Sequence, residues 1–149
     1  MHIARLNHSY KIASTSHDNI TVYHNQQEAK NMYELIQRLI AFKYACKMNH
    51  WSTNNYSMHL LFDRLTEEVD DWADSVAESY FMARNEKSVF KPDLLVPKMV
   101  DKDLVSACKK IIEMCDKLQQ DKDLDEGTKS LLGDIEAAFL GKLALAQLK

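Results

Sequence analysis

Two pairs of side chains with the ligand chemistry of a metal site stand on one predicted helix, which runs from about Tyr56 to Ala83. His59 and Asp63 are four residues apart, and Asp74 and Glu78 have the same spacing. Because residues four apart share a helix face, each pair can offer two ligands to a single ion. Mixed histidine and carboxylate ligands suit iron, manganese or zinc better than a cation that binds oxygen alone.

Both pairs are predicted to point away from the core of their own subunit. At about 100° per residue they share one arc of the helical wheel with Glu67 and Asp70. The large apolar residues cluster on another part of the wheel: Met58, Leu61, Leu65, Val69, Trp72 and Val76. A ferritin instead aims glutamate and Glu-x-x-His ligands into its own bundle. No glutamate of this helix has a histidine three residues further on, so a second molecule is predicted to complete the site.

The distance between the two pairs also points to a second molecule. Asp63 and Asp74 lie about 16 Å apart along a straight helix at 1.5 Å per residue, which one ion cannot bridge. If a second copy lies antiparallel across a two-fold axis near Glu68 and Val69, each pair meets the other pair of the opposite chain. Two-fold homodimers are the commonest assemblies, and their interfaces are self-complementary. From the spacing alone, the simpler explanation of these residues is an acidic helix face that contacts solvent and binds no metal.

The elements that must position these residues begin with a polar lead-in. Residues 1–25 lack sustained periodicity and are expected to form an N-terminal arm, followed by one domain over residues 26–149. Apolar residues at three- and four-residue steps predict a first helix from Gln26 to Trp51. A turn follows at Ser52–Asn55, where two asparagines can adopt left-handed conformations. The second helix is the one that carries the two pairs.

Two further helices are predicted after a long connection. The segment Arg84–Val100 holds both prolines. Asp101 or Asp103 is expected to cap the third helix, and Asp123 with Glu126 has the spacing of a capping box for the fourth. One short turn and one long connection match a ferritin-like four-helix bundle with a single crossover between its second and third helices. The predicted fold class is therefore all-α.

Composition agrees with one helical domain and argues against nucleic-acid binding. The 149 residues include 3 glycines and 2 prolines, which leaves little room for turns and linkers. Hydrophobic residues make up 46% and charged residues 28%, as in globular proteins. The net charge of −3 supplies no basic field, and Arg5 and Lys11 are the only firm positive charges of the arm. DNA binding by the arm is not predicted.

The cysteines predict a reducing environment. Cys46, Cys108 and Cys115 are odd in number and form no CxxC pair, so a disulfide framework is not expected and core packing is. Lys142 is interpreted as one of several scattered surface charges. The first residues lack the apolar stretch of a secretory signal, and no run approaches the about 20 apolar residues of a membrane span. We expect a cytoplasmic protein.

Segments spread over residues 30–149 resemble the Dps, or mini-ferritin, family. Residues 47–51 (KMNHW) resemble the end of that family's first helix, where a His-Trp pair is characteristic. Residues 59–63 (HLLFD) are similar to its LHxLFD segment. Residues 74–79 (DSVAES) are similar to its DxxAER segment, with Ser79 in place of the arginine.

This resemblance implies a ferroxidase site shared between subunits. One subunit would supply His50, His59 and Asp63, and its two-fold mate Asp74 and Glu78. Members of the family form hollow dodecamers, oxidise Fe(II) with peroxide or oxygen, and store the ferric mineral, and some coat DNA. The resemblance implies iron at a mono- or di-iron site, with zinc or manganese as alternatives.

Two functions are carried forward. The first is a Dps-like ferroxidase that stores iron and protects against oxidative stress. The second is a ferritin-like structural or interaction subunit, a divergent copy of cellular or phage origin with weak or no ferroxidase activity. The turn between His50 and His59 is shorter than the family norm and lacks its Gly-Pro, which predicts a smaller contribution from His50 than from Asp63. Trp51 either intercepts stray oxidising equivalents or packs at the helix end.

Overall fold

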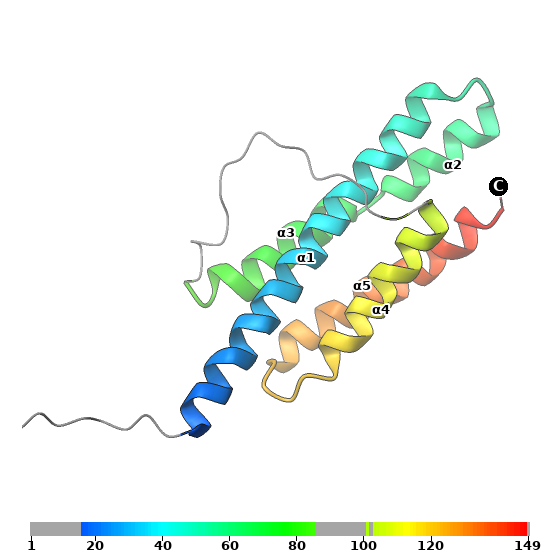
Figure 1. The fold of residues 1–149 in the computed structure, drawn as a ribbon. Coiled ribbons are helices and arrows are strands. Elements are labelled where there is room, and N and C mark those ends of the chain that lie inside the picture. Colours follow the sequence, from blue (N-terminus) through cyan, green and yellow to red (C-terminus); the bar gives the residue numbers. More distant parts are fainter. Residues whose placement is uncertain (1–15, 86–100, 102, 149) are drawn as a thin grey trace, which may run out of the picture.

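The computed structural model describes residues 16–85, 101 and 103–148, and all the regular secondary structure within them is helical. The elements are α1 (Ser16–Ser52), α2 (Tyr56–Thr66), α3 (Val69–Val76), the π-helix η1 (Ala77–Met82), α4 (Leu104–Gln119) and α5 (Glu126–Ala146). In Figure 1 the long α1 runs beside α2 and α3. α4 and α5 lie side by side, and the axis of this pair runs roughly along that of α1. The all-α prediction is confirmed for the described residues. Most of the predicted crossover, residues 86–100, lies outside them.

The first helix is longer than the sequence predicted. It begins at Ser16, so it takes in residues 16–25, which were expected to belong to the polar arm. Extending an existing helix costs far less than nucleating a new one, so polar residues can continue a helix without an apolar face of their own. The predicted end near Trp51 is confirmed, because α1 ends at Ser52. Residues 1–15 lie outside the described part of the chain.

The turn after α1 is built by capping and not by left-handed residues. Asn55 has an extended backbone, and its side-chain oxygen accepts a hydrogen bond from the backbone N–H of Met58 at 3.1 Å. This bond satisfies one of the free donors at the start of α2. Among the described non-glycine residues, only Glu68 and Asn85 have a positive φ, so the asparagines of the turn do not adopt the left-handed conformation open to them.

Aspartates cap both C-terminal helices. Asp103 accepts from the backbone N–H of Ser106 at 2.8 Å, which confirms it as the cap of α4. Asp125 accepts from the backbone N–H of Thr128 at 2.9 Å and caps α5. The predicted capping box from Asp123 is therefore wrong by two residues.

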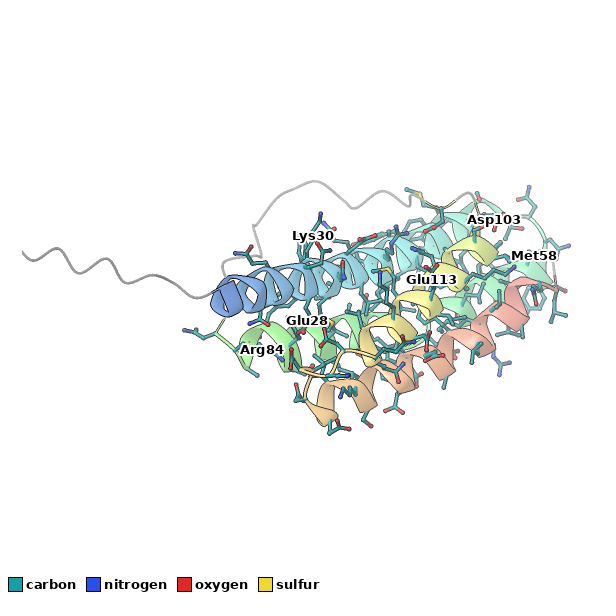
Figure 2. The ribbon with its side chains drawn as sticks, turned by 60° about the horizontal axis from the view of Figure 1, so that its bottom comes forward. Glu28, Lys30, Met58, Arg84, Asp103 and Glu113 are labelled. Atoms are coloured by element: carbon teal, nitrogen blue, oxygen red, sulfur yellow. The ribbon has the colours of Figure 1, made fainter. Side chains whose placement is uncertain are left out.

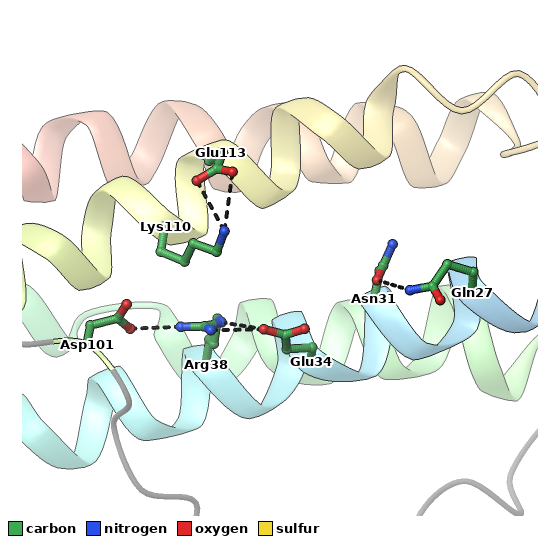
Figure 3. A network of polar contacts seen from close by, with 7 residues as sticks. All are labelled: Gln27, Asn31, Glu34, Arg38, Asp101, Lys110 and Glu113. Atoms are coloured by element: carbon green, nitrogen blue, oxygen red, sulfur yellow. Dashed lines mark hydrogen bonds and ion pairs between the residues drawn. The ribbon is translucent and has the colours of Figure 1, made fainter.

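Asp101, the other candidate cap, ties the start of α4 to α1. Its carboxylate accepts from the Arg38 guanidinium at 2.9 Å. The same guanidinium donates to Glu34 one turn earlier on α1, also at 2.9 Å (Figure 3). Arg38 and Asp101 are largely buried, so this pair is better shielded from solvent than the exposed pair between Lys110 and Glu113 on α4.

The second helix is not continuous, which corrects the prediction of one helix over Tyr56–Ala83. It ends at Thr66, and Glu68 takes a left-handed conformation with φ 63° and ψ −4°. The helix resumes as α3, where the backbone N–H of Trp72 bonds the carbonyl of Glu68 at 2.9 Å. From Ala77 the turns widen into η1. The helical-wheel argument assumed a straight rod, so the break changes how its two halves are oriented.

Lys142 of α5 stands at this break. It is only 7% exposed, and its ammonium donates to the backbone carbonyl of Glu67 at 2.8 Å. Its interpretation as a surface charge is wrong. Burial disfavours the charged form and lowers the pKa of Lys142, while the neighbouring thiol of Cys46 and the carboxylate of Glu67 oppose this shift.

The core joins all the helices. Phe42 of α1 and Phe139 of α5 meet edge to face, with ring centroids 5.1 Å apart. All three cysteines are buried, as predicted. Burial raises the pKa values of the Cys108 and Cys115 thiols to about 12, so these side chains stay protonated and unreactive. No helix in the described residues combines the length and hydropathy that a membrane span needs.

A charged cluster closes the end of the bundle opposite the α1–α2 turn. Figure 2 shows Glu28 and Arg84 at this end, with Met58 and Asp103 at the other. The Arg84 guanidinium lies 4.0 Å from the centre of the Tyr80 ring. Glu28 is 7% exposed. Burial raises the pKa of its carboxyl, the hydrogen bond from the Tyr80 hydroxyl opposes the rise, and the Asp121 carboxyl adds to it.

A pH-dependent stability follows from Glu28. Its raised pKa favours folding when the carboxyl is protonated, and that contribution is lost as the pH rises through the folded-state pKa. We expect the variant Glu28→Gln, which stays neutral, to be more stable than wild type at pH 7. Urea unfolding of both proteins between pH 4 and pH 8 measures the difference, which is expected to grow as the pH rises. A difference that does not change with pH would contradict this role for Glu28.

Candidate metal-binding seam

The side chains of His50 and His59 are in contact next to the turn that joins α1 to α2. The rings of His50 and His59 stack with centroids 3.7 Å apart and planes inclined by 30°. The Nδ1 atom of His50 lies 3.1 Å from the backbone oxygen of His59, and the Nδ1 atom of His59 lies 3.2 Å from that of His50. The short turn therefore brings His50 against His59. The smaller contribution expected of His50 stays a prediction.

These reciprocal bonds place the proton on each imidazole. A carbonyl oxygen only accepts, so each Nδ1 must donate and carry the hydrogen. The Nε2 atom of each neutral ring is then left with its lone pair. Metal-binding histidines usually have this arrangement, in which one ring nitrogen donates to a carbonyl or carboxylate and the other binds the ion. In the neutral form of the ring, His50 and His59 could therefore each offer Nε2 to a metal ion.

Lysines of α1 pair with the carboxylates that follow. The Lys47 ammonium lies 3.4 Å from the Asp63 carboxylate, which is 57% exposed. One turn earlier, Lys43 forms an ion pair with Asp70 of α3. We call this line of residues, with the two histidines, the seam between α1 and α2–α3. A cation that binds Asp63 must displace Lys47, at a cost of about 1 kcal/mol or less for an exposed pair.

The second predicted ligand pair lies beyond the break. Asp74 is exposed on α3, and Glu78 is exposed on η1. The helix changes from α to π between them, so their separation is not that of two residues on one regular α-helix. π-Helical turns are rare and frequent at functional sites. The hydroxyl of Ser79, which stands at the position of the Dps arginine, is buried without a hydrogen-bond partner.

The single chain brings only part of the predicted ligand set together. Among the residues that the structure describes, no three histidine, cysteine, aspartate or glutamate side chains gather closely enough to hold a metal ion. His50 and His59 touch, Asp63 is paired with a lysine, and Asp74 and Glu78 follow the break.

Exposed apolar residues lie on the two helices that form the seam, and the sequence analysis missed them. Tyr44, Met48 and Trp51 share one face of α1, and Trp51 is 69% exposed. Tyr56 and Leu60 share one face of α2, and Tyr56 is 75% exposed. We call these five residues the apolar flank. Their three- and four-residue spacing on each helix was the available signal. Trp51 is mostly exposed.

Residues 50–143 match the profile of a family described as a family of unknown function (DUF5856). The match covers well over half of the chain and includes all five candidate ligands. Comparison with curated proteins and with solved structures finds no match.

A prediction follows from the pairing of Lys47 with Asp63. The substitution Lys47→Met removes the competing ammonium and keeps the apolar stem, so we expect Co(II) to bind up to about fivefold more tightly. Titration followed by the visible absorption of Co(II) measures the affinity. Lys110→Met, which breaks an exposed ion pair with Glu113 on α4, is the matched control and is expected to have no effect. Weaker binding by Lys47→Met would show that Lys47 supports the site and does not compete with the ion.

Proposed function

This chain belongs to the DUF5856 family, and we propose that it is a ferritin-like subunit of the Dps type that binds and oxidises Fe(II) at sites shared between two-fold-related copies. The observation that carries the proposal is the histidine pair. His50 and His59 are tethered through Nδ1, and in the neutral form each has Nε2 left to bind a cation, in a seam that also holds Asp63. Both rings are only half-buried.

The order and direction of the helices support a ferritin-like arrangement. α1 is followed by a short turn and then by α2, α3 and η1, which together return along it. The segment 86–100 separates η1 from α4, and a short loop joins α4 to α5. A four-helix bundle with one long connection has this order of elements. The broken second helix takes the place of one continuous helix in that plan.

The proposed dimer brings the two incomplete halves together. A two-fold axis near Glu68 would set the His59 and Asp63 end of one chain against the Asp74 and Glu78 end of its partner. The apolar flank would supply apolar contacts in the same interface. Protein interfaces commonly have an apolar core together with polar groups. A stable interface buries about 800 Å² on each partner. We propose the dimer as the functional unit and a cytoplasmic dodecamer as its assembled form.

The ligand chemistry suits Fe(II) as the substrate. Neutral imidazole nitrogens bind Fe(II), and carboxylates stabilise the more highly charged Fe(III) product. Two Fe(II) ions supply the two electrons that reduce one hydrogen peroxide, with two protons, to two water molecules. In this scheme Lys47 leaves Asp63 when iron arrives. Zinc or manganese would compete for the same nitrogen and oxygen ligands.

A structural or interaction subunit is the second candidate, and one observation favours it. Asp63 and Asp70 are already paired with Lys47 and Lys43, so this face needs no metal ion to balance its charge. The apolar flank can drive association without iron. Oxidation kinetics distinguish the two candidates, because both include the same assembly.

The ferroxidase proposal predicts a specific loss of activity. We expect the double variant Asp74→Ala with Glu78→Ala to oxidise Fe(II) at least about tenfold more slowly than wild type, as the loss of ligand-shell groups commonly reduces activity by 10- to 100-fold. Ferric absorbance with oxygen and then with peroxide measures the rate. Glu113→Ala with Asp116→Ala, two exposed carboxylates on α4, is the control. Wild-type rates equal to those of the Asp74/Glu78 variant and of buffer would leave only the structural candidate.

The apolar flank predicts the assembly. Because Met48 and Trp51 would be buried between copies, we expect Met48→Glu with Trp51→Glu to convert the oligomer to monomers. Sedimentation or native mass spectrometry at micromolar concentration measures this change. Leu148→Glu, at an equally exposed apolar residue beyond α5, is the matched control and is expected to remain oligomeric. A wild-type protein that is already monomeric would overturn the shared site.

A further inference from the structure

At the break between α2 and α3, backbone carbonyl groups lose the hydrogen bonds that a continuous helix would give them. The last turn of α2 is tightened, with the N–H of Glu67 bonded to the carbonyl of Arg64 at 3.4 Å. Glu68 then takes its left-handed conformation. For a residue with a side chain this conformation costs roughly 1–2 kcal/mol, so neighbouring contacts must hold it.

Lys142 supplies such a contact from another helix. Its ammonium reaches from α5 to the carbonyl of Glu67 at 2.8 Å. A cation at the C-terminal end of a helix stabilises both the free carbonyl and the helix dipole. The side chain is 7% exposed and has as neighbours the fully buried thiols of Cys46 and Cys108 and the carboxylates of Glu67 and Glu68. A buried charge in this position is costly, which argues for a specific role.

The two sides of the break are each attached to α1. On the α2 side, His59 stacks on His50. On the α3 side, Asp70 pairs with Lys43. Lys142 contacts the junction between them from α5, through the backbone carbonyl of Glu67.

We propose that Lys142 is a positioning residue for the shared metal site, because its hydrogen bond to Glu67 sets where Asp74 and Glu78 lie relative to His59 and Asp63. This inference rests on the proposed function. Lys142 does not touch the metal ion. It acts through the backbone, and without it α3 would leave α2 in a range of directions. The four ligands of the dimer would then no longer converge on one ion.

The test compares Co(II) affinity among variants of the full-length chain. We expect Lys142→Met to bind Co(II) at least about tenfold more weakly than wild type, as for other residues that orient metal ligands. Lys129→Met, on the same helix, is expected to bind as wild type does. In the Lys142→Met background, Glu68→Gly is expected to restore most of the affinity, because glycine adopts the left-handed conformation without strain and holds the break without the lysine.

A control separates positioning from general stability. Glu28→Gln is expected to stabilise the fold far from the break, so in the Lys142→Met background it restores stability but not Co(II) affinity. If both second substitutions restore the affinity equally, Lys142 acts only through stability and the inference is wrong. These two double variants remain comparable even if Lys142→Met alone does not fold.

Two further outcomes are distinguishable. If wild type binds Co(II) and oxidises Fe(II) but Lys142→Met binds Co(II) equally well, the positioning role is overturned while the proposed function stands. If wild type neither binds Co(II) nor oxidises Fe(II), the proposed function itself fails.

Discussion

The geometry of this face depends on the backbone carbonyl of Glu67, where the second helix stops and changes direction. A helix that ends inside a bundle leaves carbonyl groups that must find donors, because an unpaired buried polar group costs about 1–3 kcal/mol. Here the donor is the ammonium of Lys142, brought from the far end of the chain by α5. The contact joins a local feature, the left-handed Glu68, to the packing of helices that are distant in sequence.

Electrostatics and burial leave the seam incomplete within one chain. The carboxylates of Asp63 and Asp70 face lysines of α1, and the two histidines satisfy their Nδ1 atoms with each other's carbonyls. What remains available is outward-facing: two imidazole nitrogens, exposed carboxylates and the apolar flank. The five residues of the apolar flank are 46–75% exposed within the chain.

The fold was predictable where one physical rule acted locally. Three- and four-residue apolar spacing identified the helices after Gln26, and Asp103 was recognised as a cap because it precedes an amphipathic segment. The failures came where a second interaction decided. Asp125 caps α5 in place of Asp123, because its carboxylate reaches both the N–H and the hydroxyl of Thr128. The π-helical turn that carries Glu78 leaves no pattern in side-chain periodicity.

The sequence by itself determined that the described part of the chain is helical, that its cysteines are core residues, and that Asp63, Asp74 and Glu78 are exposed, because each of these follows from spacing on a helix. Only the tertiary structure decided that His50 stacks on His59, that Lys47 covers Asp63, and that Lys142 is buried at the break. These contacts join residues on different helices. Their partners depend on how the helices pack, which no local spacing records.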